Sequence, residues 1–232
     1  MKTIGLIGGT SWVSTVDYYR TINQLTTKHL GGINSAQILM YSVNYAGFRS
    51  LVDAGKWDEF NTEVSKRAQK LEQAGADCIL LCANTMHMAA DAVQKNTGIP
   101  LIHIAEVTAQ EIVAKKLSKV GLLGTRFTME KDFFKDRLKN HGIEAMIPDA
   151  EARQFIHNTI FDEMGNNIFT ATTKARYLQE IDKLLQAGAE GIIFGCTEIP
   201  LLIPPAECKF PVFDTLEIHA RKAVEFALDI AG

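Results

Sequence analysis

The sequence predicts an α/β fold: two pseudosymmetric, doubly wound, parallel-sheet domains with the active site between them. Short apolar runs without alternation, such as 78–82 and 191–195, are typical of parallel strands buried on both faces, and amphipathic helical patterns separate them. Three motifs also occur twice in the same order, at offsets of 116, 113 and 111 residues. A repeated order of this kind indicates an internal duplication.

The repeated motifs define the two halves of the chain. Residues 3–9 recur at 119–125, residues 75–87 at 188–200, and residues 99–102 at 210–213. The second pair places Ala83 at the position equivalent to Cys196. We expect one domain to contain residues 1–98 with about 214–232, and the other to contain about 99–213.

In the first half, each strand is expected to end in residues suited to a turn. Gly8 and Gly9 follow the first strand, and Ser11 or Ser14 caps a helix that runs to about Leu30. Later helices are expected at 57–73, which ends at Gly75, from Asn84 through Val93, and at about 105–116. Residues 44–53 are expected to form a loop. The expected strands are 2–7, 37–43, 78–82 and 98–104.

The second half repeats this alternation of strand and helix. Its strands are expected at 119–125, 143–147, 191–195 and 210–213. Helices are expected at about 128–140, 150–164 and 170–186, with a last one after residue 213. The carboxyl ends of parallel strands are where open α/β sheets bind ligands. Cys196 and the Ala83-Asn84-Thr85 segment are therefore the first candidates for chemistry.

Composition excludes several classes of protein. A net charge of −3 offers no basic field for nucleic acid and no polybasic patch for a membrane. No apolar run approaches the roughly 18 residues that span a bilayer, and the amino terminus does not resemble a signal peptide. We expect a cytoplasmic protein. Its four cysteines, Cys78, Cys82, Cys196 and Cys208, are expected to be free thiols, and their spacing does not suit a metal site.

Two other features are ambiguous from sequence alone. The Gly8-Gly9 turn is as compatible with a merely tight connection as with a ligand-binding loop. Arg49 is a candidate clamp for a carboxylate, but a solvated surface arginine is the commoner case.

The motifs together resemble the cofactor-independent aspartate/glutamate racemase superfamily over the whole chain. The resemblance rests on residues 4–11, 84–87, 123–126, 195–198 and 213–215. It implies two pseudosymmetric domains, commonly a homodimer, and removal and return of the α-proton of an acidic amino acid without cofactor or metal. The family pattern has two cysteines. Cys196 matches the second, whereas Ala83 replaces the first.

The chemistry of inversion explains these two positions. Inversion removes a proton from one face of the α-carbon and delivers one to the other, so it needs two acid/base groups. A helix amino terminus is expected to lower the pKa of the Cys196 thiol. Glu198 either orients or deprotonates Cys196, or is a first-turn acid. Further polar candidates hold the substrate or cap helices: Thr10, Ser11, Arg49, Asn84, Thr85, Thr125, Thr197 and Glu198.

Three interpretations follow from the resemblance and from Ala83. The first is a racemase in which Thr85, His87 or a water serves the Ala83 side, or in which Ala83 is an introduced change. The second is a one-sided enzyme that resembles the single-cysteine decarboxylases of the superfamily. The third is a catalytically silent amino acid binder. Cys82 is not a substitute, because adjacent strand residues point to opposite faces.

Overall fold

The computed structural model describes residues 1–230. The chain divides into two compact units: unit 1 contains Met1–Ile104 together with the chain from His219 onward, and unit 2 contains Ala105–Ile218. The chain therefore leaves unit 1 after Ile104 and re-enters it at His219. Across residues 1–230, no helix is both long and apolar enough to cross a membrane.

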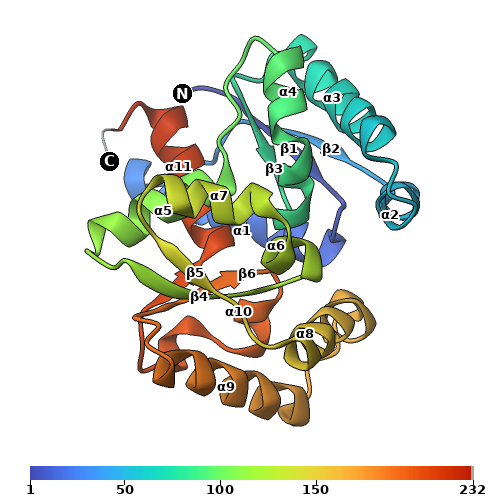
Figure 1. Cartoon of the computed structure of the whole chain (residues 1–232). Coiled ribbons are helices and arrows are strands. Elements are labelled where there is room, and N and C mark those ends of the chain that lie inside the picture. The colour runs from blue at the N-terminus through green and yellow to red at the C-terminus, as the bar shows by residue number, and fades with distance from the viewer. Residues whose placement is uncertain (231–232) are drawn as a thin grey trace. The chain divides into compact units, whose positions relative to one another are not determined.

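Unit 1 is built on a three-stranded parallel sheet in the order β2-β1-β3 (Figure 1). The central strand β1 (Ile4–Gly8) pairs with β2 (Ile38–Ser42) on one side and with β3 (Cys78–Leu81) on the other. Every residue of β1 and β3 is buried. Burial on both faces explains why these strands are continuously apolar.

The helices of unit 1 follow its strands. The apolar residues of α3 at positions 60, 64, 68 and 71 are buried, and this spacing places them on one face of the helix. Ser11 caps α1, because its hydroxyl accepts from the Ser14 N–H. The helical segments are α1 (Trp12–Leu30), α2 (Tyr45–Asp53), α3 (Trp57–Gln73), the 3₁₀ segment η1 (Asn84–Ala89), α4 (Ala90–Asn96) and, from His219 onward, α11 (Thr215–Leu228).

Unit 2 repeats this strand order with one additional full strand. Its parallel sheet has the order β5-β4-β6-β7, formed by β4 (Lys119–Gly124), β5 (Glu144–Met146), β6 (Ile192–Gly195) and β7 (Val212–Asp214). The helical segments are α5 (Ile104–Ala114), α6 (Arg126–Glu130), α7 (Asp132–Asn140), α8 (Ala150–Asp162), η2 (Met164–Asn166), α9 (Ala171–Gln186), α10 (Ile199–Leu202) and η3 (Pro205–Glu207). Two parallel-sheet domains confirm the predicted α/β fold class.

Two predicted elements are wrong. Residues 98–104 form no full strand, since their only pairing is a single bridge between Leu101 and Ile79. Pro100 lacks an N–H, which shortens the ladder there. Residues 44–53 contain α2 rather than a loop, because Phe48 and Val52, four residues apart, are both buried and Asn44 caps the helix.

Candidate active site

Cys196 follows directly after β6 in unit 2. The register pairs Gly195 of β6 with Gly124 of β4, so Cys196 and Thr125 leave neighbouring strands side by side. On the other side of β6, the Thr215 hydroxyl donates to the Phe194 carbonyl at 2.8 Å. The carboxyl end of this sheet therefore brings together the thiol and two threonines, as parallel pairing requires.

The Cys196 thiol is hydrogen-bonded to a buried carboxylate. Its Sγ donates to Oε2 of Glu198 at 2.9 Å, and the Thr197 hydroxyl donates to the same oxygen at 3.1 Å. Glu198 is 4% exposed and Cys196 is 7% exposed. Glu198 makes no side-chain cap to α10, which it precedes. Of the two roles considered for Glu198, the geometry matches direct contact with the thiol.

The protonation of Cys196 differs from the sequence-based expectation. Burial raises the pKa of the Cys196 thiol well above its usual value, and the charge of Glu198 raises the pKa further. A partly exposed thiol at a helix start would have a lowered pKa, but this thiol is buried and α10 spans only residues 199–202. Cys196 is therefore held as a thiol, which is a proton donor, and Glu198 is the adjacent group able to accept its proton.

Tyr177 of α9 is a neighbour of this pair that the sequence does not indicate. Its hydroxyl lies 3.1 Å from the Thr159 hydroxyl and donates to the Ile156 carbonyl at 3.2 Å. Burial raises the pKa of Tyr177, and Cys196 and Glu198 are among the groups whose charges also raise it. No sequence signal distinguishes this tyrosine from an ordinary core residue, since it is fully buried on the apolar face of α9.

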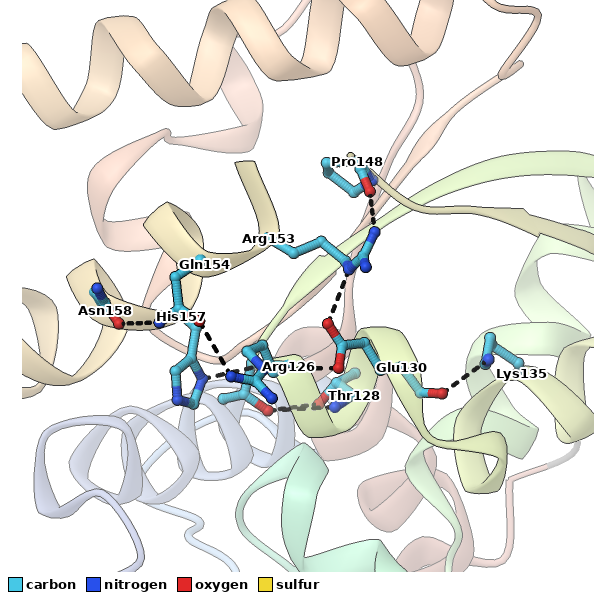
Figure 2. Close-up of polar contacts among 10 residues, drawn as sticks. Arg126, Thr128, Glu130, Lys135, Pro148, Arg153, Gln154, His157 and Asn158 are labelled. Carbon is cyan, nitrogen blue, oxygen red and sulfur yellow. Dashed lines mark hydrogen bonds and ion pairs between the residues drawn. The ribbon is translucent and has the colours of Figure 1, made fainter. Parts of the chain in front are cut away.

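Thr125 joins β4 to α6, and Arg126 after it is hydrogen-bonded to α8. The Thr125 side chain caps α6 by accepting from the Thr128 N–H. Figure 2 shows Arg126, whose backbone N–H donates to Nδ1 of His157 at 3.2 Å and whose guanidinium donates to Gln154 at 3.1 Å. Of the two roles expected for Thr125, the structure shows the helix cap. A capping hydroxyl can also contact a substrate.

In unit 1, Ala83 follows β3 at the same edge of its sheet as the turn after β1. Ile7 pairs with Leu81, and the Cys82 N–H donates to the Ile7 carbonyl at 3.0 Å, so Gly9 and Thr10 lie beside the start of η1. The Thr10 hydroxyl is buried and, among the described residues, has no hydrogen-bond partner. A buried hydroxyl without a partner is costly unless a ligand or water satisfies it.

The remaining candidates in unit 1 are distributed around this turn. Asn84 is buried and opens η1, and Thr85 beside it is half-buried. The Arg49 guanidinium Nε donates to both carboxylate oxygens of Asp53 at 2.8 Å, an ion pair within α2. Cys82 is fully buried, and burial raises its pKa, so its thiol is not available on the Ala83 side.

All four cysteines are free, which confirms that prediction for the described chain. Within residues 1–230, no group of three or more His, Cys, Asp or Glu side chains is placed to hold a metal ion.

Known proteins resemble this chain over most of its length. A family model described as Asp/Glu/Hydantoin racemase matches residues 7–223. The broad specificity amino-acid racemase RacX of Bacillus subtilis (strain 168) is 26% identical over 174 residues, which cover 72% of each chain.

Two solved structures resemble the whole chain. A candidate Asp/Glu racemase from Yersinia pestis is 45% identical with a TM-score of 0.92, covering 98% of this chain and 100% of that one. An aspartate racemase homologue from Pyrococcus horikoshii OT3 is 34% identical with a TM-score of 0.86, at the same coverage. Taken with the match to the family model, these similarities show that the chain belongs to the Asp/Glu/hydantoin racemase family.

Proposed function

We propose that this chain is an amino acid racemase that acts on aspartate or glutamate without a cofactor, by removing and returning the α-proton. The observation that carries the proposal is the buried hydrogen bond from Cys196 to Glu198 at the carboxyl end of β6. A thiol paired with a carboxylate can both give and take a proton, which is what α-proton exchange requires.

On the Cys196 side, the proton moves in either direction. In removal, Glu198 accepts the thiol proton and the thiolate takes the proton from the α-carbon, leaving the electron pair on a carbanion-like intermediate. In return, the S–H bond breaks toward the α-carbon. Because burial holds the thiol protonated, return is the easier direction for this pair.

For the opposite face of the α-carbon, the chain lacks the second acid/base group of the family pattern. The internal repeat and the family resemblance both equate Ala83 with the missing acid/base group, and a methyl group neither holds nor releases a proton. We propose that the enzyme is one-sided: it exchanges the α-proton of one enantiomer much faster than it inverts that enantiomer.

The polar groups at both sheet edges are proposed to bind the substrate. Thr10 supports this role most directly, since its buried hydroxyl lacks a partner among the described residues. Thr125, Thr197 and Asn84 would contact the α-carboxylate and the charge that develops beside it. Arg49, with Ser11 and Thr85, would contact the side-chain carboxylate once Arg49 exchanges Asp53 for the ligand.

A second candidate function is favoured by the same protonation state. A thiol held protonated, in a chain that has alanine at the equivalent position of the repeat, suits delivery of a proton to one face of an enolate-like intermediate, as a single-cysteine decarboxylase of the superfamily would require. A racemase and a decarboxylase would use the same Cys196 site, but only the decarboxylase would release carbon dioxide. A silent amino acid binder is the third possibility.

The deciding experiment follows α-hydrogen exchange in heavy water. Each enantiomer of aspartate and glutamate is incubated with the protein, and deuterium at the α-carbon is measured by mass spectrometry beside chiral analysis. The one-sided racemase predicts fast exchange in one enantiomer, slow inversion and no carbon dioxide. Cys196→Ala should remove the exchange. Binding without exchange in the parent protein would contradict the proposal and favour the silent binder.

We also propose that the protein is a homodimer, as the family resemblance implies. An apolar stripe on α1 supports self-association: Trp12, Val16 and Tyr19 are 66%, 47% and 54% exposed and lie on one face of the helix. Sedimentation equilibrium should give twice the 25.6 kDa chain mass. A single-chain mass across the micromolar range would contradict it.

A further inference from the structure

A cluster of three histidines, of which His87 and His219 are buried and His103 is half-buried, lies beside the Ala83 turn in unit 1. The ring of His87 is 4.8 Å from that of His103 and 5.5 Å from that of His219, between ring centroids. His219 also packs edge-on against Tyr18 at 5.7 Å. The three histidines and the neighbouring Tyr18 come from four separate segments: Tyr18 from α1, His87 from η1, His103 from the residues before α5, and His219 from α11.

The hydrogen bonds of His87 define its tautomer. Its Nε2 accepts from the Ile104 backbone N–H at 3.2 Å, so Nε2 carries no proton. Its Nδ1 lies 3.1 Å from the Ala83 carbonyl, an acceptor, so Nδ1 carries the proton and donates. The neutral imidazole therefore ties the turn that begins at residue 83 to the residue at which the chain leaves unit 1.

His219 has the complementary tautomer. Its Nε2 donates to the Ile102 carbonyl at 2.7 Å, and its Nδ1 accepts from the Tyr18 hydroxyl at 2.8 Å. His219 is the residue at which the chain re-enters unit 1. Both points of chain crossing are thus connected to the cluster by directional hydrogen bonds, and His87 satisfies both of its bonds only as a neutral ring.

The surroundings keep these rings neutral. Burial holds the pKa of His87 well below its usual value, and the charges of His103 and His219 lower it further. Burial also lowers the pKa of His219, to about 4. The titratable groups packed around His87 are His103 and His219, with Tyr18 beyond His219. Protonation of His87 would place an N–H against the N–H of Ile104.

We propose that His87 is a positioning residue that sets the conformation of residues 83–85 by donating its Nδ1 proton to the Ala83 carbonyl. The proposal rests on the proposed function in one respect, since the turn it positions is the half of the site that contains residue 83. The Ala83 carbonyl also accepts from the Met86 N–H at 3.2 Å, so the two donors together fix its direction. Loss of the imidazole donor would free the turn to rotate.

Two substitutions of similar size separate the two hydrogen bonds of His87. In His87→Asn the amide nitrogen takes the place of Nδ1, so donation to Ala83 is kept and the acceptor for Ile104 is lost. In His87→Gln the amide oxygen reaches the place of Nε2, so the acceptor is kept and donation to Ala83 is lost. His141→Asn is the control, because His141 belongs to unit 2 and contacts Glu106 instead.

The experiment places each substitution in an Ala83→Cys background and measures alkylation of the new thiol by peptide mass spectrometry, a readout independent of catalysis. We expect His87→Gln to change the alkylation rate at position 83 by about ten-fold, the equivalent of one buried hydrogen bond. His87→Asn and His141→Asn should leave the rate within about two-fold. Nitrogen-15 NMR of the parent protein should show His87 as the Nδ1–H tautomer at pH 7.

The outcomes separate this proposal from the proposed function. If His87→Gln alters thermal stability but not alkylation at position 83, His87 is only structural and the proposal is wrong. Equal effects of Asn and Gln would also overturn it, as would an Nε2–H tautomer. Absence of α-hydrogen exchange in every variant would contradict the racemase proposal, while the alkylation rates would still decide the role of His87.

Discussion

At the residue scale, the two equivalent positions of the repeat differ in chemistry. Cys196 has a titratable group with a buried partner at 2.9 Å, whereas Ala83 has none, and its backbone carbonyl accepts from His87 and from the Met86 N–H. One position of the repeat therefore has a thiol that burial and Glu198 keep protonated, and the other has only a methyl group. Substitutions at positions 83 and 196 and their partners test separate parts of the proposed mechanism.

Glu198→Gln should lower the pKa of Cys196. The glutamine removes the negative charge that, after burial, raises this pKa, yet it retains an oxygen that can accept from the thiol. Thiolate formation, followed by absorbance at 240 nm against pH, should shift to lower pH. Exchange of the α-proton should fall by about 10²–10⁴-fold, because the base that receives the thiol proton is lost. An unchanged titration curve would show that Glu198 does not act on the thiol.

Ala83→Cys should create or strongly raise racemisation. A thiol there restores an acid/base group, and such groups typically contribute about 10²–10⁴-fold each. Circular dichroism of L-aspartate and L-glutamate solutions measures the inversion, and Ala83→Ser is a control that adds polarity without a comparable acid. If the parent protein already racemises quickly and the cysteine adds nothing, another residue serves that face.

At the element scale, the turn after β1 depends on the absence of a side chain at Gly9. Gly9 has a φ of +79°, and a Cβ there would lie 2.3 Å from the Val43 carbonyl oxygen. The Val43 N–H donates to the Gly8 carbonyl at 3.0 Å, which holds the end of β2 against this turn. The close approach positions Thr10, the first residue beyond the turn.

Gly9→Ala should therefore destabilise the protein more than Gly31→Ala. Both glycines have positive φ, and Gly31, with φ 73° and ψ 177°, has a backbone conformation that is almost confined to glycine, so we expect each alanine to cost about 1–3 kcal/mol in backbone strain. A methyl group added at Gly31 would meet no atom within 4 Å, whereas one added at Gly9 would overlap backbone, which adds about 1–3 kcal/mol. Urea unfolding measures both. Equal losses of unfolding free energy would show that the β1 turn relaxes freely.

At the scale of the whole molecule, the buried histidines link global stability to pH. The folded pKa of His219 is about 4, below its usual 6.5, so between these values the unfolded chain binds a proton that the folded chain does not. The contribution of the neutral His219 to the unfolding free energy is fully present above pH 6.5 and is lost as the pH falls toward 4. The lowered pKa of His87 acts in the same direction.

The unfolding free energy should thus fall between pH 6.5 and 4 by about 1.4 kcal/mol per pH unit for each such histidine. Urea unfolding at pH 7 and pH 5 measures this dependence. His219→Gln should reduce the slope, while His29→Gln, at an exposed position of α1, should leave it unchanged. If the unfolding free energies of all three proteins fall equally between pH 7 and pH 5, the carboxylates rather than His219 determine this pH dependence.

Much of the architecture can be predicted because it depends on local pattern. Buried parallel strands must be continuously apolar, so β3 and β6 are recognisable, and with them the positions of Ala83 and Cys196 at their carboxyl ends. The turn residues Gly8, Gly9 and Ser11 similarly mark the start of α1. These features need only the periodicity and chemistry of neighbouring residues.

The tertiary structure alone decided the features that depend on distant residues. The sequence predicts a lowered pKa for Cys196, but burial and the direction of the Glu198 carboxylate raise it. The strand expected at 98–104 is reduced to one bridge with Ile79. The histidine cluster joins residues from 18 to 219, a separation that no local pattern records. Burial and long-range hydrogen bonds determine protonation, and both exist only once the chain has folded.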